Sequence, residues 1–247
     1  MSALVETRGL GRSFGGLRAV DSVDFSLPEG EIRAIIGPNG AGKTTFVSLI
    51  CGRVAPTDGT ISFDGRDITG MPADRRVMAG IAYTFQITSI FANLTVEENV
   101  TLAAMRRHVG RAGKRYSPAA LRQASLSALG RVGLRDHADA VAGNLAYGHQ
   151  RLLEVAMGLA LEPRLLVLDE PTQGLSDTEI ESFIALVREI GQQATVLLIE
   201  HNMPVVMALA EQITVMDQGR IIAEGTPDAI RANAAVQQAY LGAPADG

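Results

Sequence analysis

A glycine-rich segment near the start of the chain has the residue types and spacing of a phosphate-binding loop. It runs from Gly37 to Thr44 as GPNGAGKT and follows a β-branched run at 31–36. Glycines let successive backbone N–H groups turn toward phosphate oxygens, and the positive end of a following helix faces the same charge. In such a loop Lys43 reaches the β- and γ-phosphates, and the Thr44 hydroxyl binds Mg²⁺. A plain glycine-rich turn would show this spacing only by chance, so the segment predicts a nucleotide-binding loop.

Two acidic residues, Asp169 and Glu170, close the apolar run at 165–168. A buried carboxylate without a partner costs free energy, so a metal or nucleotide site is a natural reason for the pair. Asp169 would hold Mg²⁺ through a water, and Glu170 would orient or deprotonate the water that attacks a γ-phosphate. A strand end that emerges into solvent would also carry acids. The phosphate-binding loop upstream favours the functional interpretation.

Alternating strands and helices would position these residues. Compact apolar runs at 31–36, 165–167 and 195–199 predict buried strands, and apolar periodicity predicts helices over 44–51 and about 177–190. This alternation is typical of a mainly parallel sheet. The first 30 residues indicate short strands and turns.

The middle and the end of the chain differ from this pattern. Between about 87 and 144 no strong strand appears, while Thr95 with Glu98 forms a capping box and Ser117-Pro118 is typical of a helix start. We therefore expect a helical insertion. A hairpin around Gln218-Gly219 and two short helices, the first beginning at Thr226-Pro227, are predicted to follow.

Composition excludes several classes of protein. The chain has 247 residues, a formal net charge of −5 and 47% hydrophobic residues, which is ordinary globular usage. A mildly acidic chain without a basic run argues against nucleic acid as a partner. The single Cys51 argues against a disulfide framework, and Glu6 and Arg8 interrupt the N-terminal segment, unlike a signal peptide. No apolar run reaches ~18 residues, so a membrane role would act through a partner.

Several motifs in a fixed order make the chain resemble the ATP-binding cassette (ABC) ATPases of ABC transporters, from Leu4 to Gly242. In chain order they are Walker A (37–45), the Q-loop glutamine (Gln86), the signature (145–151), Walker B (165–169) with Glu170, the D-loop (174–177) and the switch histidine (His201).

The resemblance implies a role for each matched residue. Its catalytic residues are Lys43, Gln86, Glu170 and His201. Its Mg²⁺ ligands are Thr44, Gln86 and Asp169. Its ATP-contacting residues are Phe14, which would stack on adenine, and Asn39, Gly40, Ala41, Gly42, Lys43, Thr44 and Thr45. ATP and Mg²⁺ are thus the expected ligands.

The signature departs from the family's usual Leu-Ser-Gly-Gly-Gln. Here the matching residues, which would contact the ATP of an opposing subunit, are Ala146, Tyr147, Gly148 and His149. Ala146 has no hydroxyl for the γ-phosphate, although backbone N–H groups and a helix dipole remain available. Signatures of this form and the segment 236–242 resemble those of branched-chain amino acid importer ATPases. Lipopolysaccharide-exporter ATPases have a similar tail and remain the alternative.

The resemblance implies an α/β fold: a P-loop NTPase core with a mainly parallel sheet, an N-terminal antiparallel β-subdomain and an inserted helical subdomain. We expect one ABC ATPase domain over 1–247. Its parts are a β-rich core (1–86 and 160–225), a helical subdomain with the signature (87–159) and C-terminal helices (226–247).

The resemblance also implies partners. They are transmembrane permease subunits, a second ABC ATPase that is either a copy or a paralogue, and indirectly a periplasmic solute-binding protein. The expected location is the cytoplasmic face of the inner membrane, with Ile87, Ile90 and Phe91 as candidates for the permease-docking groove. Two alternatives remain. A non-transport ABC ATPase is disfavoured by the single cassette, and a regulatory module without hydrolysis is disfavoured by the presence of Glu170 and His201.

Overall fold

The computed structural model describes residues 3–84, 89–106 and 117–241. Four strands form an antiparallel sheet in the order β2-β1-β4-β5: β1 (Ala3–Phe14), β2 (Leu17–Pro28), β4 (Asp58–Phe63) and β5 (Arg66–Asp67). Six form a second sheet in the order β10-β9-β3-β8-β7-β6: β3 (Ile32–Ile36), β6 (Ile81–Thr84), β7 (Leu165–Asp169), β8 (Thr195–Ile199), β9 (Gln212–Asp217) and β10 (Arg220–Gly225).

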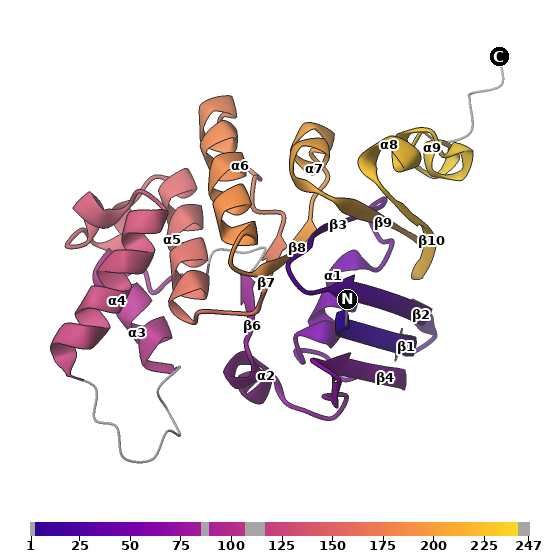
Figure 1. Ribbon diagram of the computed structural model, residues 1–247, viewed down its shortest axis with the longest axis horizontal. Helices are drawn as coiled ribbons and strands as arrows, with labels where there is room; N and C mark the ends of the chain where they lie inside the picture. The colour runs from indigo at the N-terminus through magenta and orange to yellow at the C-terminus, as the bar shows by residue number, and fades with distance from the viewer. Residues whose placement is uncertain (1–2, 85–88, 107–116, 242–247) are drawn as a thin grey trace.

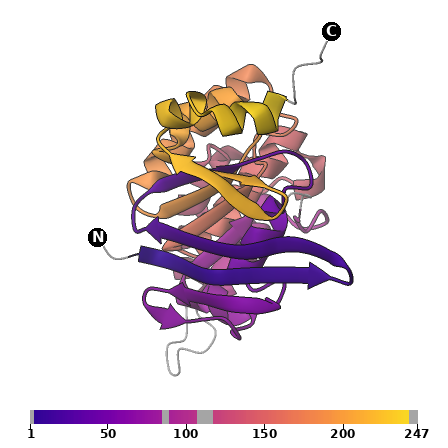
Figure 2. The ribbon, with the colours of Figure 1, turned by 90° about the vertical axis from the view of Figure 1, so that its right-hand side faces the viewer.

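Helices pack against both sheets, and the outer face of the antiparallel sheet carries no helix among the described residues (Figures 1 and 2). In the described residues they are α1 (Lys43–Ile50), α2 (Ala73–Ala79), α3 (Val96–Arg106), α4 (Pro118–Arg131), α5 (Tyr147–Ala160), α6 (Asp177–Gly191), α7 (Met203–Leu209), α8 (Pro227–Arg231) and α9 (Ala234–Leu241). Turns of 3₁₀ helix occur at Arg135–His137 and Ala142–Asn144. None of these helices is long and apolar enough to cross a lipid bilayer.

The six-stranded sheet confirms the expected parallel core. Neighbouring strands are parallel except for the β9–β10 hairpin. In the central strands Ile199 is paired with Ile35 on one side and with Asp169 on the other. The chain leaves β3, β7 and β8 within two residues of this row. Residues 37–44, Asp169, Glu170 and His201 therefore emerge at one edge of the sheet.

The antiparallel sheet differs from the expected short strands. β1 and β2 are each 12 residues long. Their pairing is broken by register shifts, and Gly9 and Ser22 have positive φ angles of 54° and 51°. Such bulges interrupt the two-residue alternation of a strand, which is why the sequence pattern indicates several short strands instead of two long ones.

Helix α1 lies between the two sheets. Its Phe46, Val47 and Ile50 are fully buried in a hydrophobic cluster to which both the antiparallel sheet and one face of the parallel sheet contribute. Phe46 meets Phe25 of β2 edge to face at a centroid distance of 5.3 Å. Directly after α1, Cys51 is buried, and this burial raises the pKa of its thiol to about 12. The helix that follows the phosphate-binding loop is thus fixed on both sides.

The helices α3, α4 and α5 group together at one end of the molecule (Figure 1). They share one hydrophobic cluster with the other face of the parallel sheet, where Leu166, Leu168 and Leu198 are fully buried. The expected capping box is present: Thr95 N donates to Glu98 Oε2 at 2.7 Å, and Glu98 N donates to Thr95 Oγ1 at 3.1 Å. The helical part therefore shares its core with the sheet.

The chain ends with the hairpin and short helices that the sequence predicts. The turn residues Gln218 and Gly219 both have positive φ, 45° and 79°, the geometry of a tight two-residue hairpin turn. The hydroxyl of Thr226 accepts from Ala229 N at the start of α8. Figure 2 shows the hairpin and the C-terminal helices above the N-terminal strands.

Candidate functional site

The phosphate-binding loop connects β3 to α1 and is shaped by contacts that only glycine permits. A Cβ at Gly37 would lie 2.1 Å from the carbonyl oxygen of Met216, and a Cβ at Gly42 would lie 2.3 Å from that of Ala19. Both glycines have positive φ, 154° and 94°. The β9–β10 turn supports the loop from outside, because Gly219 N donates to Ala41 O at 3.0 Å.

The Lys43 side chain lies across this loop. Its Nζ donates to the carbonyl oxygens of Gly37 at 2.7 Å and Pro38 at 3.0 Å. Burial lowers the pKa of Lys43, and the negative charges of Glu170 and Asp169 oppose that change. The ammonium is thus directed at the space enclosed by the loop, where a phosphate would lie.

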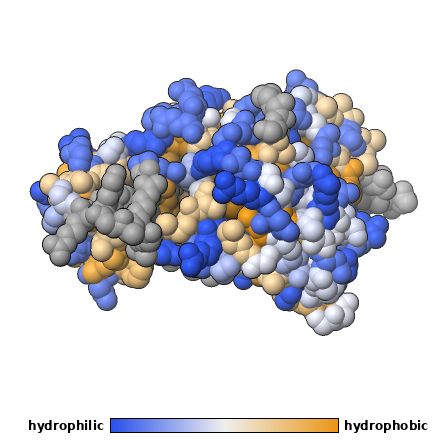
Figure 3. Space-filling view, turned by 60° about the horizontal axis from the view of Figure 1, so that its bottom comes forward, coloured by the Kyte–Doolittle hydropathy of each residue, from blue (hydrophilic) through white to orange (hydrophobic). Residues whose placement is uncertain are grey.

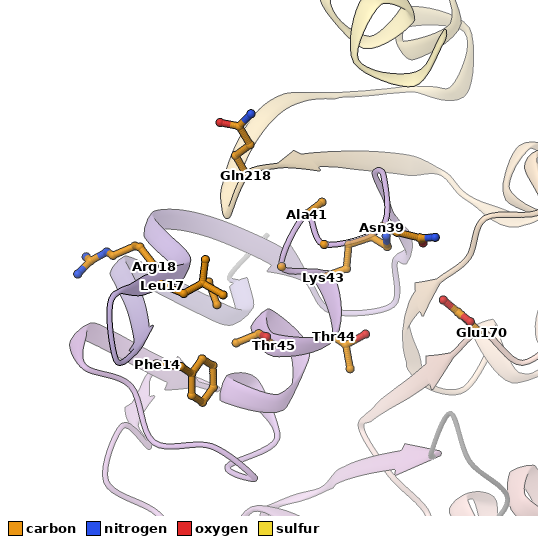
Figure 4. Close-up of a pocket in the computed structure, with 13 residues that line it drawn as sticks. Phe14, Leu17, Arg18, Asn39, Ala41, Lys43, Thr44, Thr45, Glu170 and Gln218 are labelled. Atoms are coloured by element: carbon orange, nitrogen blue, oxygen red, sulfur yellow. The ribbon is translucent and has the colours of Figure 1, made fainter. Parts of the chain in front are cut away.

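A pocket of about 760 Å³ opens beside the loop. It is lined by Phe14, Leu17, Arg18, Ala19, Asn39, Gly40, Ala41, Gly42, Lys43, Thr44, Thr45, Glu170 and Gln218. All the ATP-contacting residues expected from sequence lie here, together with Glu170, which faces the loop from across the pocket (Figure 4). Leu17, Arg18, Ala19 and Gln218 were not expected; they are turn and strand residues without a recognisable motif.

Asp169 is fully buried at the end of β7. Its Oδ2 accepts a hydrogen bond from the Tyr83 hydroxyl at 2.6 Å, whereas its Oδ1 has no partner within the described part of the chain. Burial raises the pKa of Asp169, and the Tyr83 hydrogen bond opposes that rise. An orphaned buried carboxylate oxygen beside the pocket suits a hydrated divalent cation. Tyr83 was not expected, because nothing near it in sequence pairs it with Asp169.

Glu170 has a left-handed backbone with a φ of 48°. That conformation is strained for a residue other than glycine and is concentrated at functional sites. Its backbone N–H donates to the carbonyl oxygen of Ile199 at 2.9 Å, which holds the residue against the end of β8. This local turn presents the Glu170 side chain to the pocket.

His201 follows β8 and is exposed. Its backbone N–H donates to Glu200 Oε2 at 2.9 Å, and Glu200 is fully buried. Sequence reasoning missed Glu200, although an acid closing an apolar run is the same signal that Asp169 gives. Gln86 and Ile87 lie outside the described residues.

The signature residues do not line the pocket of their own chain. Ala146 precedes α5 as its N-cap and makes no side-chain capping bond. The next residue, Tyr147, packs against the D-loop, because a Cβ at Gly174 would lie 2.8 Å from its ring. Gly148 lies so close to Glu179 that a Cβ would approach Oε1 to 2.3 Å. The N-terminus of α5 is therefore placed against the D-loop of the same chain.

Substitution of Ala146 by serine is expected to stabilise the fold. Ala146 has the extended backbone of an N-cap, φ −57° and ψ 151°, where a hydroxyl can accept an N–H of the first turn. We expect Ala146→Ser to raise the free energy of unfolding by about 1 kcal/mol, measured by urea denaturation. Ala146→Val adds bulk without an acceptor and should give no gain; equal gains from both variants would contradict the capping interpretation.

Phe14 is available for stacking. It is 44% exposed, although it is aromatic, and the Arg12 guanidinium lies 4.5 Å from its ring centroid. If Phe14 stacks on adenine, Phe14→Ala should weaken ATP binding by about 1–3 kcal/mol, or about 5- to 150-fold in Kd. Titration with a fluorescent ATP analogue measures this loss. Phe14→Tyr keeps the ring and should bind as the unmodified chain does; an unchanged Kd in Phe14→Ala would contradict the stacking role.

Known proteins share this arrangement. Residues 20–173 match the ABC transporter family, and residues 220–246 match the branched-chain amino acid ATP-binding cassette transporter family. The chain is 41% identical to the high-affinity branched-chain amino acid transport ATP-binding protein BraF of Pseudomonas aeruginosa, across 97% of this chain and 98% of BraF. It is also 41% identical to LivG of Salmonella typhimurium, a protein of the same description, with the same coverage.

Solved structures agree with the sequence relatives. The ADP conformation of MJ1267, an ATP-binding cassette of an ABC transporter, superposes with a TM-score of 0.86 at 27% identity, covering 98% of this chain and 100% of that one. A nucleotide-free ATP-binding cassette from an ABC transporter gives 0.85 at 27% identity, covering 97% and 99%. By these matches the chain, with residues 37–44, Asp169, Glu170 and His201 at one edge of its parallel sheet, belongs to the family of ABC transporter ATP-binding proteins.

Proposed function

We propose that this chain hydrolyses ATP to power the import of branched-chain or closely related amino acids through a membrane ABC transporter. The observation that carries the proposal is the 41% identity to BraF and LivG over nearly the whole length of all three chains. The match of residues 220–246 to the branched-chain amino acid cassette family supports this class of solute over lipopolysaccharide.

The pocket supports a division of labour during hydrolysis. The loop N–H groups and Lys43 hold the phosphates of ATP, and Phe14 holds the base. Thr44, Asp169 and Gln86 would hold Mg²⁺, which would neutralise negative charge on the phosphates. Glu170 orients the attacking water and takes its proton. His201 contacts the γ-phosphate, so that the loop after β8 responds to the presence of that group.

A second ATPase subunit completes each site in this proposal. Residues 146–149 lie outside the pocket of their own chain, so they are available to cover ATP bound by a partner in a head-to-tail pair. Because Ala146 has no hydroxyl, the backbone N–H groups of Gly148 and its neighbours supply the contacts to the γ-phosphate. Closure on ATP and reopening after phosphate release form the working cycle.

The permease subunits dock on the helical part of the chain in this proposal. Phe91, which precedes α3, is 54% exposed and is free to contact a partner. Ile90 instead packs against the shared hydrophobic cluster and belongs to the core. Leu102 and Met105 of α3 are also exposed. Figure 3 shows that hydrophobic surface lies among hydrophilic residues on one face of the molecule. The proposed location is the cytoplasmic face of the membrane, with a periplasmic solute-binding protein on the other side.

Reconstituted transport tests the proposed function. The chain, its genomically neighbouring ATPase and permeases are placed in proteoliposomes with ATP inside, and the neighbouring solute-binding protein is added outside. Uptake of radiolabelled leucine, isoleucine or valine that requires enclosed ATP is the expected result, with labelled arginine as the solute control. ATP hydrolysis without uptake of any branched-chain amino acid would overturn the proposed solute class.

A further inference from the structure

A buried carboxylate that no ABC motif assigns lies between the acidic pair and the switch histidine. Glu200 directly follows β8 and has no exposed surface. Two donors come from Thr172, whose N–H lies 3.1 Å from Oε1 and whose hydroxyl donates to the same oxygen. Two more are the backbone N–H groups of His201 at 2.9 Å and Asn202 at 3.0 Å, both on Oε2.

The two oxygens of this carboxylate serve two different loops. Among the described residues, Oε1 accepts hydrogen bonds from the loop after β7, two residues beyond Glu170, and Oε2 accepts from the loop that carries His201. Within the described ranges no lysine or arginine forms an ion pair with Glu200. Its charge is stabilised by these N–H and O–H donors instead. Burying a charged group costs free energy. The presence of the Glu200 carboxylate at this buried position therefore indicates that it is needed to hold the surrounding loops in place.

A backbone hydrogen bond already ties the loop after β7 to β8, and the Glu200 carboxylate adds to this connection. Glu170 N donates to the carbonyl oxygen of Ile199 at 2.9 Å, so the start of the first loop is already tied to β8. The Glu200 bonds extend this tie past the strand ends. They fix Thr172 on one side and the backbone of His201 on the other. The separation between the two loops is therefore set by one rigid, three-atom group.

We propose that Glu200 is a positioning residue for ATP hydrolysis: it holds the His201 loop in register with the loop that carries Glu170. The inference rests on the roles proposed above for His201 and Glu170. Loss of the carboxylate would leave nucleotide binding intact, because the phosphate-binding loop makes none of the Glu200 bonds. It would slow the chemical step, because the two loops would no longer move as one unit.

Glu200→Gln is the sharpest change, because it keeps the size of the side chain. The amide oxygen can still accept from one loop, but the NH₂ group cannot accept from the N–H groups of the other loop. We expect kcat for ATP to fall about tenfold or more, and KM to stay within about twofold. Glu211→Gln is the matched control; Glu211 accepts from Ile32 N at 3.3 Å at the opposite end of the sheet, and kcat should stay unchanged.

A double-mutant cycle separates positioning from simple destabilisation. We first expect His201→Ala to lower kcat strongly; wild-type turnover there would reject the proposed role of His201 and the inference with it. In the His201→Ala background, Glu200→Gln should then cost less than about twofold, because its effect is transmitted through His201. The opposite result is a double variant whose loss of kcat equals the product of the two single losses. If His201→Ala by itself lowers kcat strongly, that result would overturn the Glu200 inference and leave the role of His201 standing.

Thr172 provides a second route should Glu200→Gln fold poorly. Thr172→Val removes the hydroxyl bond to Oε1 and should lower kcat with KM unchanged, whereas Thr172→Ser restores the hydroxyl and should restore kcat. Equal activities in the valine and serine variants would count against the positioning role.

Discussion

Glu170→Gln is expected to abolish ATP turnover while leaving ATP bound. The carboxylate lines the pocket opposite the phosphate-binding loop, and its amide analogue has nearly the same shape but cannot take a proton from water. Loss of a general base lowers rates by about 10²–10⁴-fold. The Kd for ATP should change little, because Lys43 and the loop N–H groups are untouched. Phosphate release measured under saturating ATP checks the rate, and retained nucleotide after gel filtration checks the binding.

The expected product of this substitution is a stable ATP-bound pair of subunits. Size-exclusion chromatography of Glu170→Gln with its partner ATPase and ATP should show a dimer that persists for many turnover times of the unmodified protein. Glu181→Gln, at an exposed position of α6, is the matched control and should hydrolyse ATP normally. Ordinary phosphate release by Glu170→Gln would remove Glu170 from the role of base.

Lys43→Ala is expected to abolish nucleotide retention. Two carbonyl oxygens aim the Lys43 ammonium into the phosphate-binding loop. Hydrogen bonds to charged groups contribute about 1.5–3 kcal/mol each, so the loss of contacts to two phosphates weakens Kd about 100-fold or more. Titration with a fluorescent ATP analogue measures the change.

The controls for Lys43 use the chain's own composition. Lys114 is the only other lysine, and Lys114→Ala should bind ATP as the unmodified chain does. Lys43→Arg keeps the charge, yet it should bind poorly, because a planar guanidinium does not suit a loop closed around a compact ammonium. Normal Mg-ATP binding by Lys43→Ala would show that the phosphate-binding loop has been assigned wrongly.

The sequence was sufficient for the elements whose signals are local. The apolar run before Gly37, the capping box at Thr95 and the turn at Gln218-Gly219 each depend on neighbouring residues, and each appears where the pattern predicts it. The same holds for α6, which begins at Asp177. The parallel core then followed from the alternation of strands and helices.

Non-local contacts were beyond a single sequence. The hydroxyl of Tyr83 reaches Asp169, 86 residues away, and Thr172 reaches Glu200 across 28 residues. Neither pair has a fixed spacing that a pattern could detect. Both depend on which strands are neighbours in the sheet, and that order is set by packing of the whole chain. The contact of Tyr147 with Gly174 is of the same kind.

The bulged strands show a different limit. Hydrophobic alternation predicts a strand only while successive side chains alternate between faces. Gly9 and Ser22 shift the register of β1 and β2, so the alternation is lost although the hydrogen-bonded pairing resumes. The sequence pattern therefore underestimates the lengths of β1 and β2, although it correctly predicts that these segments are strands.

The burial of Cys51 makes the chain a convenient starting point for spectroscopic labelling. Its thiol is enclosed after α1 and has a pKa of about 12, so the reactive thiolate is scarce at neutral pH. It is also the only cysteine in the protein. A single cysteine introduced at an exposed position, such as Asp177, would therefore take up a maleimide probe alone. Distances between two such probes would follow the approach of the subunits directly, without first replacing a native residue of the core.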